Sequence, residues 1–325
     1  MIFAAEPSFW ISFAQQTLDG LTFGALIALI ALGYTMVYGI VELINFAHGD
    51  LFMLGCFLAL SQLALIGLGG LGYDATWSDP NSFQVGGIIL TMLFTAMIFC
   101  ASLNFAVDRL VYKPLRTAPK LAPLVSAIGV SFVFMNIGLF WGGPQDVNFP
   151  KLVGDQNLLP EQPDQANLRF TSKDLMVYLV TIPLMIALTA FIKFTKLGKA
   201  MRATAQNPTA AKLMGINTDR VIGITFAIGG ALAGASSIVY ALKLNTISYQ
   251  MGFQNGLYAF TAAVLGGIGR IPGAVLGGLI IGLVRYYGSA YVGENWVGAL
   301  IFGILIIILI FRPSGLLGAN TREKV

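Results

Sequence analysis

The sequence predicts an all-α protein, a polytopic membrane helix bundle of about eight to nine membrane segments with broken or re-entrant helices. The first observation is composition: the mean hydropathy is +0.78 and charged residues make up only 10% of the chain, against about a quarter in soluble domains. The second is that apolar runs recur, each long enough to cross a hydrocarbon core of roughly 30 Å as a helix. The 325 residues leave room for one membrane domain and little else.

The apolar runs give the expected helices in chain order. They cover 21–40, 51–68, 85–107, 124–141, 175–194, 221–242 and 296–311. The first 15 residues contain Glu6 and no Lys or Arg. They therefore lack the basic region of a cleaved signal peptide, and the apolar run that follows is too long for one. We expect the first helix to be retained.

Basic residues indicate how these helices are oriented. The first Lys or Arg is Arg109, and the loop at 108–123 carries four bases against one acid, so the positive-inside rule makes it cytoplasmic. The polar stretch 143–174 has five acids against three bases and is predicted to be an external loop. The basic loop 195–220 is predicted to be cytoplasmic. Counting helices back from these loops places the N-terminus outside.

The C-terminal tail from Arg312 is also expected in the cytoplasm. This requires that 243–295 crosses the membrane an even number of times or re-enters. Residues 258–287 contain seven glycines and Pro272, an irregularity that is tolerated in a membrane where neighbouring helices or water satisfy the backbone. Pairs of these glycines stand four residues apart, which favours close helix packing, with a role in a substrate path as the alternative. Whether the segment crosses twice or re-enters stays open.

A second irregular region is ELINFAHGDLF, residues 42–52. It places Glu42, Asn45, Asp50 and the only histidine, His48, within one apolar stretch. Polar groups inside a bilayer mark a pathway or a helix break. The alternative is an interfacial turn in which Asn45 or Asp50 caps the next helix.

Motifs of several other protein classes are missing from the sequence. It has no P-loop, no HExxH and no GxSxG, and in GGIGRIPG a proline, Pro272, replaces the third glycine of a dinucleotide fingerprint. Cys56 and Cys100 lie in apolar runs without His or acid at metal-ligand spacing. We therefore expect no catalytic residue, metal or cofactor. The pI near 9.0 reflects membrane sidedness and does not indicate a nucleic-acid partner.

The chain resembles the membrane permeases of ATP-binding-cassette importers for branched-chain amino acids, the LivH type. The resemblance is carried by GALIALIALGYTMVYGIVELINFAHGDLFMLG (24–55), YKPLR (112–116), GKAMRATAQNPTAAKLMGINTDRVI (198–222), AFTAAVLGGIGRIPGAVLGGLIIG (259–282) and FRPSGLLG (311–318). Because these blocks stand in the same order over nearly the whole chain, the signal is specific. The external loop departs from the family pattern by its length and acidity.

The resemblance implies that 1–325 is a single permease domain of an importer in the cell membrane. It implies a second permease subunit, two cytoplasmic ATPase subunits, an external solute-binding protein and an amino-acid substrate such as leucine, isoleucine or valine. A permease for urea or short-chain amides is the nearest alternative. A self-sufficient secondary transporter or channel is the alternative from another class, although few ionisable residues lie in mid-span.

The resemblance also implies two sets of site residues. Coupling to an ATPase is expected at Gly198, Arg202, Ala203, Asn207, Pro208, Ala210, Ala211, Gly215 and Ile216, and the translocation pathway at Asn45, Phe46, His48, Gly49, Thr261, Gly266, Gly267 and Gly269.

Local signals are consistent with the coupling set. A helix at 198–206 should end near Asn207–Pro208, because proline disfavours helical geometry in the preceding residue. A second short helix, in which Ala210 and Ala211 allow close approach of a partner, can then be terminated by Gly215.

Overall fold

The computed structural model describes residues 9–41, 45–71, 81–116, 118–119, 121–159, 168–312 and 314–318. Glu6, Glu42, part of the predicted external loop (160–167) and the end of the tail lie outside these residues. The all-α prediction is confirmed: eight described helices are long and apolar enough to cross a membrane. The strands within the described part are β1 (Val147–Asn148) and β2 (Thr246–Ile247), which pair antiparallel.

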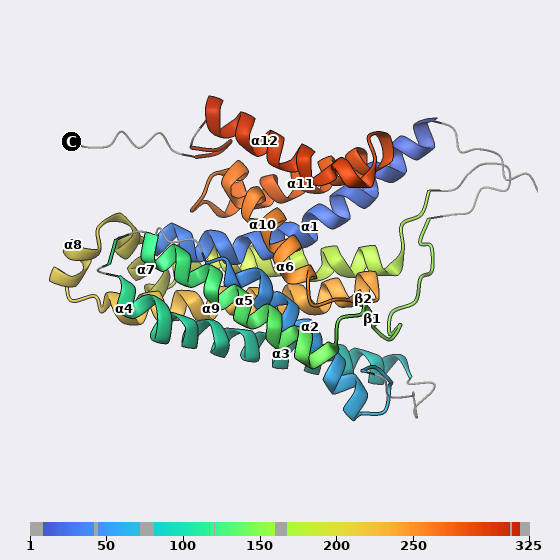
Figure 1. The fold of residues 1–325 in the computed structure, drawn as a ribbon, viewed down its shortest axis with the longest axis horizontal. Helices are drawn as coiled ribbons and strands as arrows, with labels where there is room; N and C mark the ends of the chain where they lie inside the picture. The colour runs from blue at the N-terminus through green and yellow to red at the C-terminus, as the bar shows by residue number, and fades with distance from the viewer. Residues whose placement is uncertain are drawn as a thin grey trace, which may run out of the picture.

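The helices follow one another with short connections. They are α1 (Phe9–Val41), α2 (Ala47–Leu65), α3 (Ser82–Val107), the π-helical η1 (Asp108–Tyr112), α4 (Lys113–Leu115), α5 (Leu121–Gly142), α6 (Ser172–Phe194), α7 (Lys196–Gln206), α8 (Pro208–Leu213), α9 (Thr218–Leu244), α10 (Met251–Gly266), α11 (Ile271–Tyr291), the 3-10 turn η2 (Glu294–Trp296) and α12 (Val297–Phe311). Figure 1 shows the long helices aligned with the long axis, with α4, α7 and α8 at one end of the bundle and β1 and β2 at the other. The basic loops thus gather at one end, and the described part of the acidic loop lies at the other.

The centre of the bundle consists of α1, α2 and α9. Within their most apolar windows, 78%, 72% and 78% of the residues are buried, against 17%, 22%, 17% and 11% for the helices that contain α3, α5, α6 and α12. Apolar sequence alone does not separate these groups, because every one of these helices is apolar on all sides. The outer helices therefore present apolar faces to lipid or to another subunit.

The irregular stretch 258–287 forms a helical hairpin. With its 16 residues, α10 is about 24 Å long at 1.5 Å per residue. The chain then turns through Gly267 and Gly269, whose positive φ angles of 106° and 86° suit glycine, and α11 returns antiparallel with Gly273 against Gly266. The stretch is therefore two antiparallel helices joined by a glycine turn, and of the two α11 is long and apolar enough to be a candidate membrane span.

Glycines set four apart are helix-packing positions. A Cβ on Gly278 would lie 2.6 Å from Cα of Ala28, and one on Gly24 would lie 2.7 Å from Cα of Leu279, so α1 and α11 meet backbone to backbone. Gly230 is similarly close to the Cys100 backbone of α3. Small residues at this spacing permit such approach between membrane helices.

Replacing one of these glycines should loosen the bundle. At Gly282 a Cβ would lie 2.5 Å from Cα of Gly24, whereas at Gly303 on α12 it would meet nothing within 4 Å. We expect Gly282→Leu to destabilise the protein by about 1–3 kcal/mol or more, as overpacking does, and Gly303→Leu to be neutral. Thermal unfolding of both variants in detergent measures the difference, and equal melting temperatures would contradict the packing argument.

At the β1–β2 end, side chains connect the long loop to α6 and α9. Lys243 forms an ion pair with Asp174, and Lys173 bonds both Asp155 at 2.9 Å and the Asn245 amide oxygen at 2.5 Å. Asn245 itself has a positive φ of 54° at the end of α9, a conformation that asparagine tolerates better than most residues. The described part of the loop is thus held against the bundle.

Candidate functional site

The NFAHG segment lies at a helix break deep inside the bundle. The amide nitrogen of Asn45 donates to the amide oxygen of Asn104 at 2.9 Å, and Tyr112 donates to Asn45 at 3.2 Å. The Asn104 amide continues the network by donating to the Phe226 carbonyl at 2.7 Å. Asn104 stands 11 residues before Leu115, the last residue of its helix, so it lies about 16 Å along the helix from that end. Buried polar groups that satisfy one another in this way fix one arrangement of the surrounding helices.

His48 is enclosed completely. Its ring packs edge-on against Tyr34 with centroids 4.8 Å apart, and it lies directly on Gly33, where any Cβ would collide with it. Within the described residues neither ring nitrogen makes a hydrogen bond, although the Ile30 carbonyl lies close by. An interfacial turn does not fit these positions, because Asn45 is 2% exposed and His48 0%.

The capping alternative for this segment is also wrong. Phe46 is the N-cap of α2 and no side chain caps it. The Asn45 side chain donates its hydrogen bond to Asn104 and not to the helix start, and the buried Asp50 accepts a hydrogen bond from Ser131 of α5. The segment is therefore a buried break of the kind that polar residues mark in membrane helices.

The expected pathway residues of α2 and α10 lie together. Gly49 is packed against Gly252 and Gly256 of α10, and the Phe46 ring lies 5.7 Å from that of Phe260. Beside Asn45 there is a cavity of only about 10 Å³. Thr261 is fully buried and its hydroxyl has no partner among the described residues.

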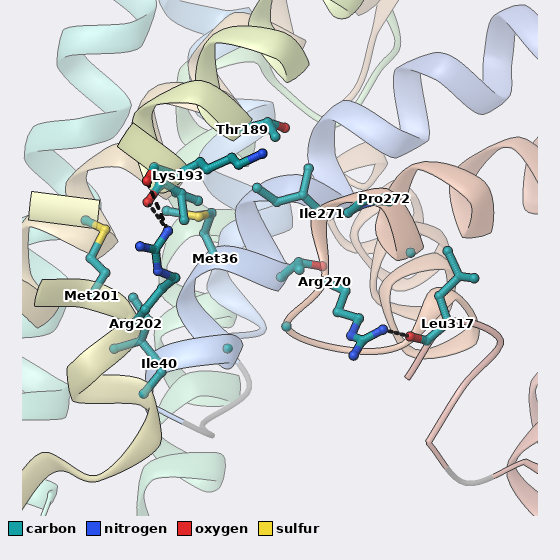
Figure 2. Close-up of a pocket in the computed structure, with 16 residues that line it drawn as sticks. Met36, Ile40, Thr189, Lys193, Met201, Arg202, Arg270, Ile271, Pro272 and Leu317 are labelled. Atoms are coloured by element: carbon teal, nitrogen blue, oxygen red, sulfur yellow. Dashed lines mark hydrogen bonds between the residues drawn. The ribbon is translucent and has the colours of Figure 1, made fainter. Parts of the chain in front are cut away.

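Further along the α10–α11 hairpin, Gly266 and Gly267 are buried and Gly269 is exposed. Gly269 lines a cavity of about 380 Å³ at the α7–α8 end of the bundle. We call this space the basic cavity, and Figure 2 shows Lys193, Arg202 and Arg270 in its walls. Its walls come from α1, α6, α7, the α10–α11 turn and the tail segment. They are Thr35, Met36, Gly39, Ile40, Thr189, Ile192, Lys193, Met201, Arg202, Ala205, Gly269, Arg270, Ile271, Pro272, Gly273 and Leu317. One residue of each expected set, Arg202 and Gly269, thus faces the same space.

The loop at 195–220 folds into two short helices, as the sequence predicts. Thr195 caps α7 by accepting from the Gly198 amide at 2.9 Å, and Asn207 ends α7 and caps α8 by accepting from Ala210 at 3.0 Å. Gly215 follows α8 with a φ of 84°, and Asn217 caps α9 by accepting from Arg220 at 3.0 Å. Side-chain caps satisfy the free amides of a helix start, so each of the three helices begins at a fixed residue.

The α7 helix is seated on the end of α6. A Cβ on Gly198 would collide with the Ile192 backbone, and Arg202 donates to the Ile192 carbonyl at 2.8 Å and the Lys193 carbonyl at 3.3 Å. Ala203 and Ile216 are half-buried, and Pro208 and Ala210 are exposed. These contacts make the loop an extension of the bundle.

One expectation about α8 needs correction. Ala211 is 4% exposed and faces its own chain, so it cannot be the residue that meets a partner. Leu213 and Met214 are 84% and 83% exposed. These two large apolar side chains, at the last residue of α8 and the residue after it, form an exposed apolar tip of the kind found at interaction sites.

Behind this loop lies an ion-pair cluster for which the sequence contains no local signal. Arg116 bonds Asp108 at 2.5 Å and Asp219 at 2.6 Å, and Lys113 lies 3.5 Å from Asp219. The cluster links the end of the α3 helix to the start of α9. No local sequence pattern predicts this pairing, because Arg116 and Asp219 are 103 positions apart.

Residues 16–310 match the family of the branched-chain amino acid transport system / permease component. This chain belongs to that family. It is 38% identical over 316 residues to the high-affinity branched-chain amino acid transport system permease protein LivH of Escherichia coli K12, covering 97% of this chain and 99% of the relative. The corresponding protein BraD of Pseudomonas aeruginosa is 37% identical, with 96% and 98% covered.

A more distant similarity is confined to part of the chain. The autoinducer 2 import system permease protein LsrC of Photorhabdus laumondii is 30% identical over 38% of this chain and 40% of its own length. No solved structure matches the chain. The predicted family, the helical membrane fold and the role as a transport permease are confirmed.

Proposed function

We propose that the chain is the permease subunit of an ATP-driven importer for leucine, isoleucine, valine or related amino acids. The observation that carries the proposal is the full-length similarity: relatives named for branched-chain amino acids cover 96–97% of the chain, whereas the autoinducer 2 permease covers 38%. A second permease completes the pathway, two ATPases supply the energy, and an external binding protein delivers the solute.

The geometry of α7 and α8 suits them to transmit motion from an ATPase. An ATPase docked on Leu213 and Met214 pushes a helix that is capped at its start and followed directly by α9. The α7 helix carries the same motion to α6 through Gly198 and Arg202. A coupling element has to be held in this way, because a loose loop absorbs the motion.

The same motion changes the basic cavity, since α7 forms one wall and the α10–α11 turn forms another. The buried break at Asn45 and His48 adjoins α10. We propose that this region and the hairpin form one permease's half of the pathway.

Reconstitution tests the proposal directly. Liposomes containing this chain, a second permease, both ATPases and an external binding protein should take up leucine when ATP is enclosed with the ATPases, and the chain alone should show no flux. Flux through the chain alone would identify a secondary transporter or channel. Uptake of urea or a short amide in place of leucine would identify the other importer class.

The proposed orientation has the α7–α8 end and the C-terminus in the cytoplasm and the N-terminus outside. It rests on the base distribution and is tested with single cysteines at two exposed positions, Gln156 and Gln206. After both native cysteines, which are buried, are replaced by alanine, we expect an impermeant thiol reagent applied to intact cells to label Gln156→Cys only. Labelling of Gln206→Cys under the same conditions would reverse the orientation.

His48 provides a test of the pathway. Because neither ring nitrogen is hydrogen-bonded among the described residues, leucine of similar volume should leave the fold stable. If a solute passes close to the ring, we expect His48→Leu to lower uptake at least tenfold while subunits still co-purify. Leu60→Met, at a fully buried position of the same helix, is the control. Normal uptake by His48→Leu would leave the histidine with a packing role only.

A further inference from the structure

The basic cavity opens into an apolar groove between α6 and α11. The groove has a volume of about 570 Å³ and shares Thr189, Lys193, Ile271 and Pro272 with the cavity. Its other walls are Met185, Ile186, Ala190, Phe194, Val275, Leu276 and Leu279. Cavity and groove therefore form one amphipathic space, with its polar part at the α7–α8 end.

Three bases line the cavity, and neither the cavity nor the groove has an acidic residue in its wall. Within the described part of the chain, Lys193, Arg202 and Arg270 make no ion pair. Arg202 donates to carbonyls at the end of α6, Arg270 donates to the Leu317 carbonyl at 2.6 Å, and the Lys193 ammonium lies 5.5 Å from the centre of the Phe194 ring. Each guanidinium has further N–H groups to offer. Such a cluster attracts a negatively charged group.

The groove runs away from this cluster toward the middle of the bundle. From Lys193 back to Met185 along α6 is eight residues, about 12 Å. From Ile271 to Leu279 along α11 is the same length, and both helices leave the same end (Figure 1). In Figure 2 the Lys193 side chain reaches from α6 into the space toward Ile271, and Arg270 lies on the opposite wall. An occupant would have its charge at the end of the bundle and its apolar part along the helices.

We propose that this space binds one anionic phospholipid, with its phosphate among Lys193, Arg202 and Arg270 and an acyl chain in the groove. Basic pockets between membrane helices on the cytoplasmic side suit such headgroups, and this end is cytoplasmic in the proposed orientation. A small soluble anion would leave the groove unfilled. A second permease subunit packed against this space would need acidic residues on its own surface to face the three bases.

Native mass spectrometry of the full chain in detergent tests the site, with phosphatidylglycerol and phosphatidylcholine as probes. We expect phosphatidylglycerol to bind and phosphatidylcholine to bind much more weakly. The triple variant Lys193→Gln, Arg202→Gln, Arg270→Gln should bind phosphatidylglycerol roughly a hundredfold less tightly, since each base near a membrane surface contributes about fivefold. The triple variant Lys196→Gln, Lys199→Gln, Arg220→Gln loses the same charge from exposed positions outside the space and should bind normally.

A separate variant examines the groove without touching a base. Ala190→Trp should fill it and weaken phosphatidylglycerol binding, and glycerol phosphate, which has no acyl chain, should not compete with the lipid. Equal binding of both lipids, or equal loss in both triple variants, would overturn the proposal. It would also be overturned if Ala190→Trp kept the lipid but abolished pairing of two permeases, because the groove would then be a subunit interface. None of these outcomes depends on transport.

Discussion

A permease carrying Leu213→Asp and Met214→Asp is expected to lose its ATPases during purification. Both side chains are more than 80% exposed at the tip of α8, so the permease itself should fold normally. Burying a side chain of this size at an interface contributes about 1.5–3 kcal/mol, and two carboxylates would in addition be desolvated. The affinity should fall by more than about a hundredfold. Co-purification of the ATPases and solute-stimulated ATP hydrolysis in liposomes measure the loss.

Two further changes show whether the shape of this tip matters as well as its apolar character. Gly215→Val forces a β-branched residue into a φ of 84° although nothing lies within 4 Å of a Cβ there, so its effect is on the backbone alone. Gly215→Asn, which tolerates that conformation better, should retain more binding. Lys199→Gln is the charge control, since one exposed charge contributes less than about 1 kcal/mol. ATPases that stay bound and stimulated in the double aspartate variant would reduce the loop to a basic membrane anchor.

Local chemistry explains why this loop could be predicted from sequence. The helix expected at 198–206 is α7 (Lys196–Gln206), and the second helix ends at Leu213, before Gly215. Proline, a capping asparagine and a glycine act on their immediate neighbours, so the sequence fixes these boundaries within two residues. The outward-facing residues were harder to predict, because burial of Ala211 depends on what packs beneath the helix.

The membrane helices were predicted in number and character more accurately than in extent. The run 21–40 lies within α1 (Phe9–Val41), and the run 51–68 begins after the start of α2 (Ala47–Leu65). The second difference arises because His48 and Asp50 interrupt the apolar pattern, although both are buried in the folded chain. Hydropathy treats a polar residue as a boundary, and only tertiary contacts can reverse that interpretation.

Contacts between distant segments could not be derived from the sequence. Asn45 and Asn104 are 59 residues apart, and Arg116 and Asp219 are 103 apart. The basic cavity likewise needs residues from five segments. The resemblance to a family placed Arg202 and Gly269 in two separate sets, and the folded chain brings them to one cavity.

Arg116→Leu is expected to destabilise the permease by about 3–5 kcal/mol, because it leaves a buried carboxylate without its partner. The Asp108 side chain is 0% exposed, and Arg116, itself only 15% exposed, bonds it at 2.5 Å. Lys113→Leu is the matched control: its contact with Asp219 is 3.5 Å long and both side chains are over 40% exposed, so its loss should cost less than about 1 kcal/mol. Thermal unfolding in detergent should rank the two variants in this order.

The double variant Arg116→Leu, Asp108→Asn separates the charge from the packing. If an unpaired carboxylate causes the instability, a neutral amide at position 108 should restore most of the lost stability. If the cause is the missing packing of the arginine stem, the stability should stay low. Arg116 also bonds Asp219 at 2.6 Å, and Asp219 lies in the first turn of α9, the helix that follows α8 in the chain. The rescued protein would still lack this link between α9 and the α3 helix. We therefore expect the double variant to bind its ATPases and hydrolyse ATP while transporting less solute per ATP. Full transport by the double variant would show that the cluster only neutralises Asp108, and a double variant as unstable as Arg116→Leu would refute the charge argument itself.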